Sequence, residues 1–153
     1  MRPSRRWTEF ARDDGSASLE FITAGLVLLV PLVYLVLALA SVQAATLAAD
    51  GAVRQATRVY VQSRTASEAR AAALRAVAVA LDDYGLDATA ASVEIRCRPR
   101  PSACLTRRGF VTVTIRFVAP LPLAPPLIDP GLPAGLPVQA TATEQVSRFW
   151  GSR

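Results

Sequence analysis

The feature that most constrains this chain is a long stretch without charge: no Asp, Glu or Arg stands between Glu20 and Asp50. Residues 21–40 read FITAGLVLLVPLVYLVLALA. About twenty helical residues span roughly 30 Å, which is the thickness of the hydrocarbon core of a bilayer. A soluble helix rarely stays apolar on every face for this length. Pro31 would break a helix in water, but a bent helix is tolerated in lipid when neighbours help. We therefore predict a transmembrane helix over residues 16–43.

The arginines around this stretch predict its orientation. The N-terminal flank carries Arg2, Arg5, Arg6 and Arg12, whereas a comparable distance on the other side carries Arg54 and Arg58. Positively charged flanks stay in the cytoplasm. The N-terminus is therefore expected in the cytoplasm, and residues 44–153 are expected outside it as an exported domain.

A cleaved secretory signal peptide is the alternative interpretation of the same stretch. It would use Ala38-Leu39-Ala40 as its A-x-A cleavage site. The apolar run is longer than the roughly 7–15 residues usual for such a peptide. It also passes without interruption into an alanine-rich helical pattern, so we favour an uncleaved anchor at this position.

A short motif stands immediately before the apolar run. The sequence there is Gly15-Ser16-Ala17-Ser18-Leu19-Glu20-Phe21. A carboxylate at the edge of a membrane span is costly unless it pairs or reaches interfacial water. Glycine, four residues and then Glu-Phe, opening a long apolar helix with an internal proline, resembles the processing site of type IV pilin-like proteins. Over residues 12–60 the chain is most similar to the TadE-like minor pseudopilins of the Flp/Tad pilus system.

This resemblance implies a processing step and a set of partners. A prepilin peptidase would cut after Gly15 on the cytoplasmic face, so that residues 1–15 are a cytoplasmic leader and Ser16 is the new N-terminus. Glu20 and Phe21 would follow as the family's Glu-Phe pair. The new α-amine is a cation near neutral pH, and Glu20 of a neighbouring subunit would neutralise it. The expected partners are the membrane, the prepilin peptidase, other pilin-like subunits and the Tad assembly machinery.

Beyond the membrane the sequence predicts two helices. The first continues to about Gln62, and a second runs from a capping box at Thr65 through Leu81, with Gly85 at its C-terminal turn. An alanine stripe recurs every fourth residue along the first helix and favours close packing: Ala40, Ala44, Ala48, Ala52 and Ala56.

The period then changes from helical to alternating, which is typical of strands. Strands are predicted at Val93–Cys97, Val111–Phe117 and Val138–Val146. The proline-rich residues 119–137 are predicted to form an irregular surface loop. The expected fold is α+β, with a long N-terminal transmembrane helix followed by a small antiparallel sheet.

The two cysteines, Cys97 and Cys104, both fall in the expected exported domain. A structural disulfide is the usual state of such a pair outside the cytoplasm. A metal site would need further thiolates or histidines, and the chain has no histidine.

The sequence offers little chemistry for catalysis. It lacks a phosphate-binding loop, a nucleophile elbow and a metal-ligand cluster, so we predict no catalytic residues and no cofactor. The net charge of +5 comes entirely from arginine, and the arginines are scattered along the chain, so nucleic acid is not an expected partner. A structural pilin-like subunit is the favoured function. The alternatives are a secreted or envelope-anchored binding protein released by signal peptidase, and a membrane-tethered hydrolase.

Overall fold

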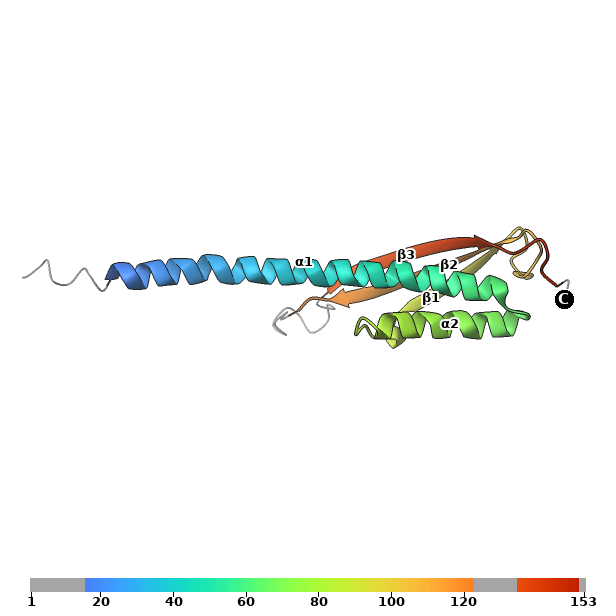
Figure 1. Ribbon diagram of the computed structural model, residues 1–153, viewed down its shortest axis with the longest axis horizontal. Helices are drawn as coiled ribbons and strands as arrows, with labels where there is room; N and C mark the ends of the chain where they lie inside the picture. The colour runs from blue at the N-terminus through green and yellow to red at the C-terminus, as the bar shows by residue number, and fades with distance from the viewer. Residues whose placement is uncertain (1–15, 123–134, 152–153) are drawn as a thin grey trace, which may run out of the picture. The chain divides into compact units, whose positions relative to one another are not determined.

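The computed structural model describes residues 16–122 and 135–151. Along the chain lie α1 (Ser16–Gln62), α2 (Ala66–Asp82), the short 3-10 helix η1 (Ala88–Ala90), β1 (Ser92–Arg98), β2 (Phe110–Pro120) and β3 (Gly135–Gln145) (Figure 1). The chain divides into two compact units, Met1–Ala38 and Leu39–Arg153. The predicted α+β fold is confirmed, with a long apolar N-terminal helix, a second helix, a three-stranded antiparallel sheet and one disulfide.

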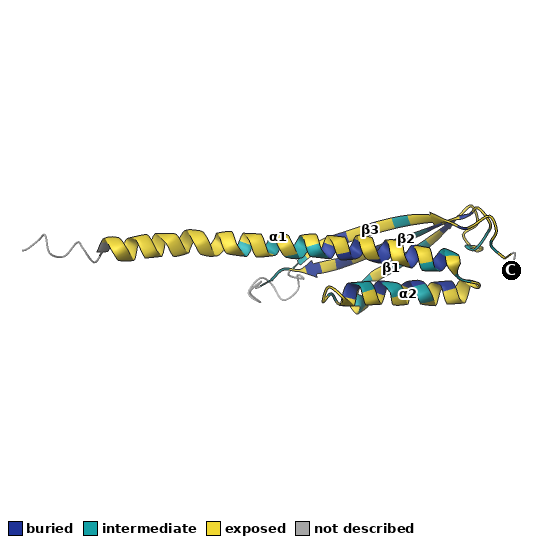
Figure 2. Cartoon of the chain, in the orientation of Figure 1, coloured by how far each residue is buried: buried dark blue, intermediate teal, exposed yellow. Residues whose placement is uncertain are grey.

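The first unit consists, where it is described, of the N-terminal part of α1. Every residue from 17 to 33 is exposed, and α1 continues through Pro31 without a break (Figure 2). Phe21 is 80% exposed and Leu28 is 74% exposed. In the described part of the chain, α1 is the one helix long and apolar enough to cross a membrane. These properties fit a membrane anchor, and they also fit a signal sequence.

Helix α2 begins and ends within one residue of the prediction. The Thr65 hydroxyl caps its N-terminus by accepting a hydrogen bond from the backbone N–H of Glu68 at 3.2 Å. At the other end Gly85 has a φ of +67°, and the N–H of Leu86 donates to the carbonyl of Leu81 at 3.0 Å. Glycine adopts that left-handed backbone without the steric cost that a side chain would add.

The three strands form one antiparallel sheet in the order β1-β2-β3, so β2 is central. Cys97 of β1 pairs with Val111 of β2, and Val138 of β3 pairs with Phe117. Burial alternates along β2 as predicted, because one face of the sheet meets the helices. The buried residues of β2 are Val111, Val113, Ile115, Phe117 and Ala119.

The predicted irregular loop over residues 119–137 is wrong at both ends. β2 continues to Pro120, and β3 already begins at Gly135 rather than at Val138. Within β3, Pro137 pairs with Val118. Proline is tolerated there because β3 is an outer strand, and the side of it that faces away from β2 needs no N–H donor. Leu121 and Pro122 follow β2 outside any strand, and residues 123–134 of the predicted loop lie outside the described residues.

The core of the second unit joins α1, α2 and the sheet in one hydrophobic cluster (Figure 2). Ala48, Ala52 and Ala56 of the alanine stripe are at most 1% exposed, whereas Ala40 in the same stripe is exposed. Small side chains allow close approach, so the C-terminal part of the stripe packs inside this unit. The buried hydroxyl of Thr57 donates to the carbonyl of Val53, one turn earlier, and is therefore satisfied.

The other face of the sheet is polar and faces solvent. Glu94 accepts hydrogen bonds from Arg96 at 2.6 Å and from Arg116 at 3.3 Å. The bond from Arg96, and then the bond from Arg116, hold the pKa of Glu94 below its ordinary value of 4.5. Arg116 also donates to Gln139 on β3 at 2.8 Å, so a polar row crosses all three strands. Such exposed pairs add little stability, and they favour this strand register.

Candidate processing and assembly site

The predicted processing segment lies at the N-terminal end of α1. Gly15 is outside the described residues, and Ser16 is the first residue of α1. Glu20 and Phe21 are both exposed. Positions 16 and 20 are one helical turn apart and lie on the same face of the helix. A cut after Gly15 would leave the whole of the described helix intact.

Glu20 is an isolated charge on an apolar helix. Beside it lies a shallow open hollow lined by Leu19, Thr23, Ala24 and Val27. Within the described residues, Glu20 forms no ion pair. The partial positive charge at a helix N-terminus favours a carboxylate in the first turns. The carboxylate is therefore available to a cation from outside the described chain.

The second predicted site is the disulfide, and it is confirmed. Cys97, near the end of β1, is bonded to Cys104 in the connector that follows. The bond closes the segment between β1 and β2, so it restrains the loop at one end of the sheet. The described residues contain no group of three or more His, Cys, Asp or Glu side chains placed to hold a metal ion.

Removing the disulfide by the double substitution Cys97→Ser and Cys104→Ser is expected to lower the free energy of unfolding. Closing so short a loop contributes about 2–3 kcal/mol in the chain-entropy model. Urea unfolding of the full chain in detergent, followed by circular dichroism, measures the loss. The wild-type chain after reduction and alkylation is the control and should lose a similar amount. Equal unfolding midpoints for the variant and the oxidised wild type would contradict this expectation.

Trp150 holds the C-terminal turn in place, a role that the sequence patterns do not predict. Its indole Nε1 donates to the carbonyl of Ser63 at 3.0 Å, and its own carbonyl accepts from Arg107 Nε at 2.9 Å. The bond to Ser63 joins residues that are 87 positions apart. The only signal in the sequence was a single tryptophan near the C-terminus, and nothing local indicated its partner.

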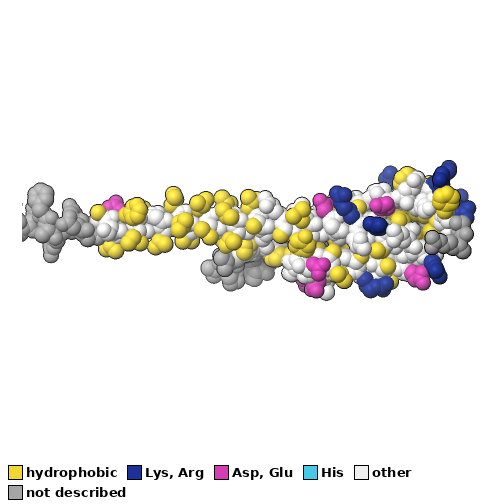
Figure 3. Space-filling model, viewed as in Figure 1, with side chains coloured by type: hydrophobic (Ala, Val, Ile, Leu, Met, Phe, Trp, Pro, Cys, Tyr) yellow, Lys and Arg dark blue, Asp and Glu magenta, His cyan; other side chains and the backbone are white. Residues whose placement is uncertain are grey.

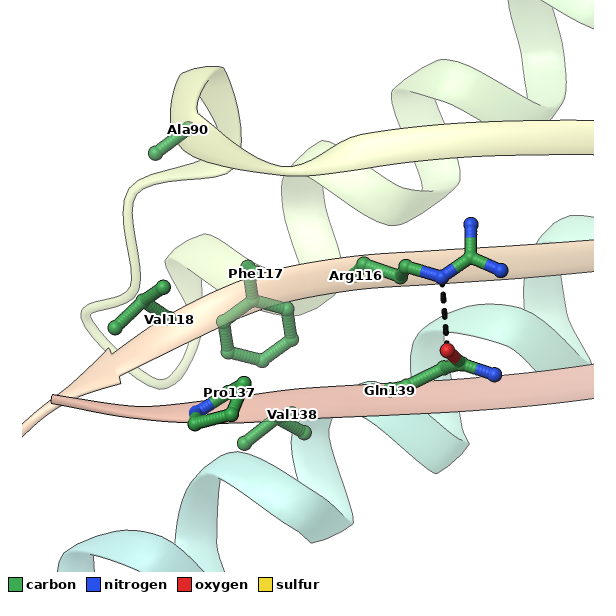
Figure 4. Close-up of a pocket in the computed structure, with 7 residues that line it drawn as sticks. All are labelled: Ala90, Arg116, Phe117, Val118, Pro137, Val138 and Gln139. Carbon is green, nitrogen blue, oxygen red and sulfur yellow. Dashed lines mark hydrogen bonds between the residues drawn. The ribbon is translucent and has the colours of Figure 1, made fainter.

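A shallow hollow opens at the end of the sheet where β2 extends beyond β1 (Figure 4). The Arg116 guanidinium at its edge is already engaged by Glu94 and Gln139. None of the lining residues is a nucleophile or a proton-transfer group, so the hollow suits an apolar group and offers no acid–base chemistry. The lining residues are Ala90, Arg116, Phe117, Val118, Pro137, Val138 and Gln139.

Comparison with known proteins adds no assignment: no family model, no curated protein and no solved structure matches the chain. The N-terminal motif and the geometry within each unit are therefore the basis for assigning a function.

Proposed function

We propose that this chain is a minor pilin-like structural subunit, similar to the TadE-like pseudopilins, and that it acts in assembly of a Flp/Tad-type pilus or a related secretion system. The observation that carries the proposal is the isolated carboxylate of Glu20, one turn into a helix that exposes apolar side chains on all sides. That helix continues into a folded unit with its own core.

The exposed apolar surface supports a membrane location. Each large apolar side chain gains about 1.5–3 kcal/mol when it is fully buried, so a whole helix of them left in water is strongly unfavourable. Lipid or the helices of other subunits would cover the surface. We place the N-terminus in the cytoplasm and the second unit outside it, because of the arginine excess before the apolar stretch.

The role of Glu20 follows from its position relative to the proposed cut. Cleavage after Gly15 would create an α-amine at Ser16, which is a cation near neutral pH. In a bundle of parallel helices shielded from water, the Glu20 carboxylate of one subunit would pair with the amine of the next. The pairing makes assembly depend on prior cleavage by a prepilin peptidase. No step of this function needs a catalytic residue in the chain itself.

One observation favours a second candidate function, a secreted or envelope binding protein released by signal peptidase. The boundary between the two units falls between Ala38 and Leu39, within the possible A-x-A site. The buried core of the second unit begins at Ala45. A cut after Ala40 would therefore leave the core of that unit intact.

The N-terminal residue of the mature protein separates the two functions. We expect protein extracted from membranes of cells that produce it with a Tad-type peptidase to begin at Ser16, as determined by N-terminal sequencing. Cells without the peptidase provide the control and should yield only the full-length chain. A mature form that begins at Ser41 would contradict the pilin-like function and support the secreted or envelope binding protein.

A further inference from the structure

Six exposed arginines gather at one end of the second unit, although they come from three segments far apart in the sequence. Hydrogen bonds hold these segments together. Trp150 Nε1 donates to the Ser63 carbonyl at 3.0 Å, and Arg107 Nε donates to the Trp150 carbonyl at 2.9 Å. The N–H of Arg108 donates to the Val146 carbonyl at 3.1 Å. We call this surface the arginine tip, and its members are Arg64, Arg98, Arg100, Arg107, Arg108 and Arg148.

Within the described residues, no arginine of the tip forms an ion pair. The three segments that form it, residues 63–65, 98–109 and 146–151, contain no carboxylate side chain. The nearest carboxylates in sequence are Glu68 and Glu144. Like charges gathered on one surface repel one another, and an anionic surface would relieve that repulsion. On the face drawn in Figure 3, arginine side chains lie at the end of the second unit that carries the turn between α1 and α2.

The same unit carries an acidic surface at the other end of α2. Helix α2 starts at the arginine tip, and its 17 residues place Asp82 about 25 Å away. We call Asp82, Asp83 and Asp87 the acidic end. All three are exposed, and among the described residues none forms an ion pair. Asp87 lies beyond α2 and caps η1, where its carboxylate accepts hydrogen bonds from the Thr89 N–H at 2.8 Å and the Thr89 hydroxyl at 2.7 Å. Asp82 and Asp83 lie at the C-terminus of α2 and oppose the helix dipole, so a cation from outside would relieve an unfavourable interaction.

We propose that the arginine tip of one copy binds the acidic end of the next copy, head to tail. The two surfaces lie on one unit and have opposite charge, and within the described residues none of their charged side chains forms an ion pair. Tyr84, 52% exposed within the acidic end, offers an aromatic face on which a guanidinium can stack. A contact between two different surfaces is heterologous and repeats without limit unless it closes into a ring. This inference deepens the proposed subunit role and rests on it for its biological meaning.

A photo-crosslinking experiment tests the contact on the full, uncut chain. The probe is benzoyl-phenylalanine at position 84, in detergent micelles, where copies are not held in one membrane plane. Copies labelled with ¹⁴N and ¹⁵N are mixed, so that mass spectrometry identifies crosslinks between chains. We expect such crosslinks to peptides that cover residues 98–109 or 146–151, with a yield that falls as salt is added.

Charge-reversal variants show whether the charges cause the contact. R98E/R100E should reduce the crosslink yield about tenfold or more, because like charges then meet. R54E/R58E, on the exposed side of α1, is the matched control and should leave the yield unchanged. Adding D82R/D83R to R98E/R100E should restore the yield. An undiminished yield in R98E/R100E overturns the proposal, as do crosslinks that map elsewhere. Binding of the tip to anionic vesicles or nucleic acid without any crosslink between chains also overturns it. Because the chain is uncut throughout, these outcomes do not depend on whether Gly15 is processed.

Discussion

Replacing Gly15 with leucine is expected to leave the full-length chain in the membrane, with almost no form that begins at Ser16. The physical reason is steric. Glycine lets the backbone enter an extended or unusual conformation in a protease cleft, and a leucine side chain would clash there. Blotting of membrane fractions for the two lengths, together with N-terminal sequencing of any shorter form, measures the effect.

Gly25→Leu is the matched control, because it makes the same change at a glycine within α1. A side chain at position 25 meets no atom within 4 Å, so this variant should be cut normally. Normal cleavage of both variants would show that Gly15 is not the processing site. It would favour the alternative, a binding protein released by signal peptidase.

Glu20 is expected to be needed for filament assembly and not for cleavage after Gly15. In Glu20→Gln the shape is kept and the charge is lost, so the mature form should still appear while filament assembly fails. Leaving one member of a poorly solvated ion pair unpaired costs about 3–5 kcal/mol. Counting pili on cells that produce the variant gives the readout. Wild-type piliation by Glu20→Gln would rule out the proposed pairing with the Ser16 amine.

The second large effect is expected in the core of the second unit, at Ile115. This side chain is 0% exposed in the middle of β2, where its backbone neighbours are Val93 on β1 and Ala140 on β3. Ile115→Ala removes buried methyl groups and leaves a cavity, which typically costs about 2–5 kcal/mol. The loss is a large share of the roughly 5–15 kcal/mol that stabilises a typical domain. Urea unfolding of the full chain in detergent, followed by circular dichroism, measures it.

Val118→Ala is the control for this prediction, because Val118 lies on the same strand and is 41% exposed. Substitution of a surface side chain usually changes stability by no more than about 0.5 kcal/mol. Similar losses at the two positions would mean that the helix-covered face of the sheet is not the main source of stability in this unit.

Local sequence patterns were enough to predict most individual elements. The charge-free run predicts the apolar part of α1, and the alternation of Val111–Phe117 predicts the centre of β2. Thr65 and Gly85 mark the ends of α2 through backbone rules that act within a few residues. The Cys97–Cys104 pairing was also accessible, because the chain has no other cysteine. The cleavage at Gly15 and the role of Glu20 remain predictions, because they concern a peptidase and neighbouring subunits.

Short-range patterns were therefore enough for the two long helices, the three strands and the apolar character of α1, but not for the short helix η1. The central place of β2, the start of β3 at Gly135 and the gathering of arginines around Trp150 depend on contacts between segments far apart in the chain. Proline signals a loop locally, but an outer strand has a side without a pairing partner and can accommodate Pro137. The arginine cluster likewise cannot be predicted from the order of residues, because hydrogen bonds between distant segments bring Arg64, Arg107 and Arg148 to one end of the unit.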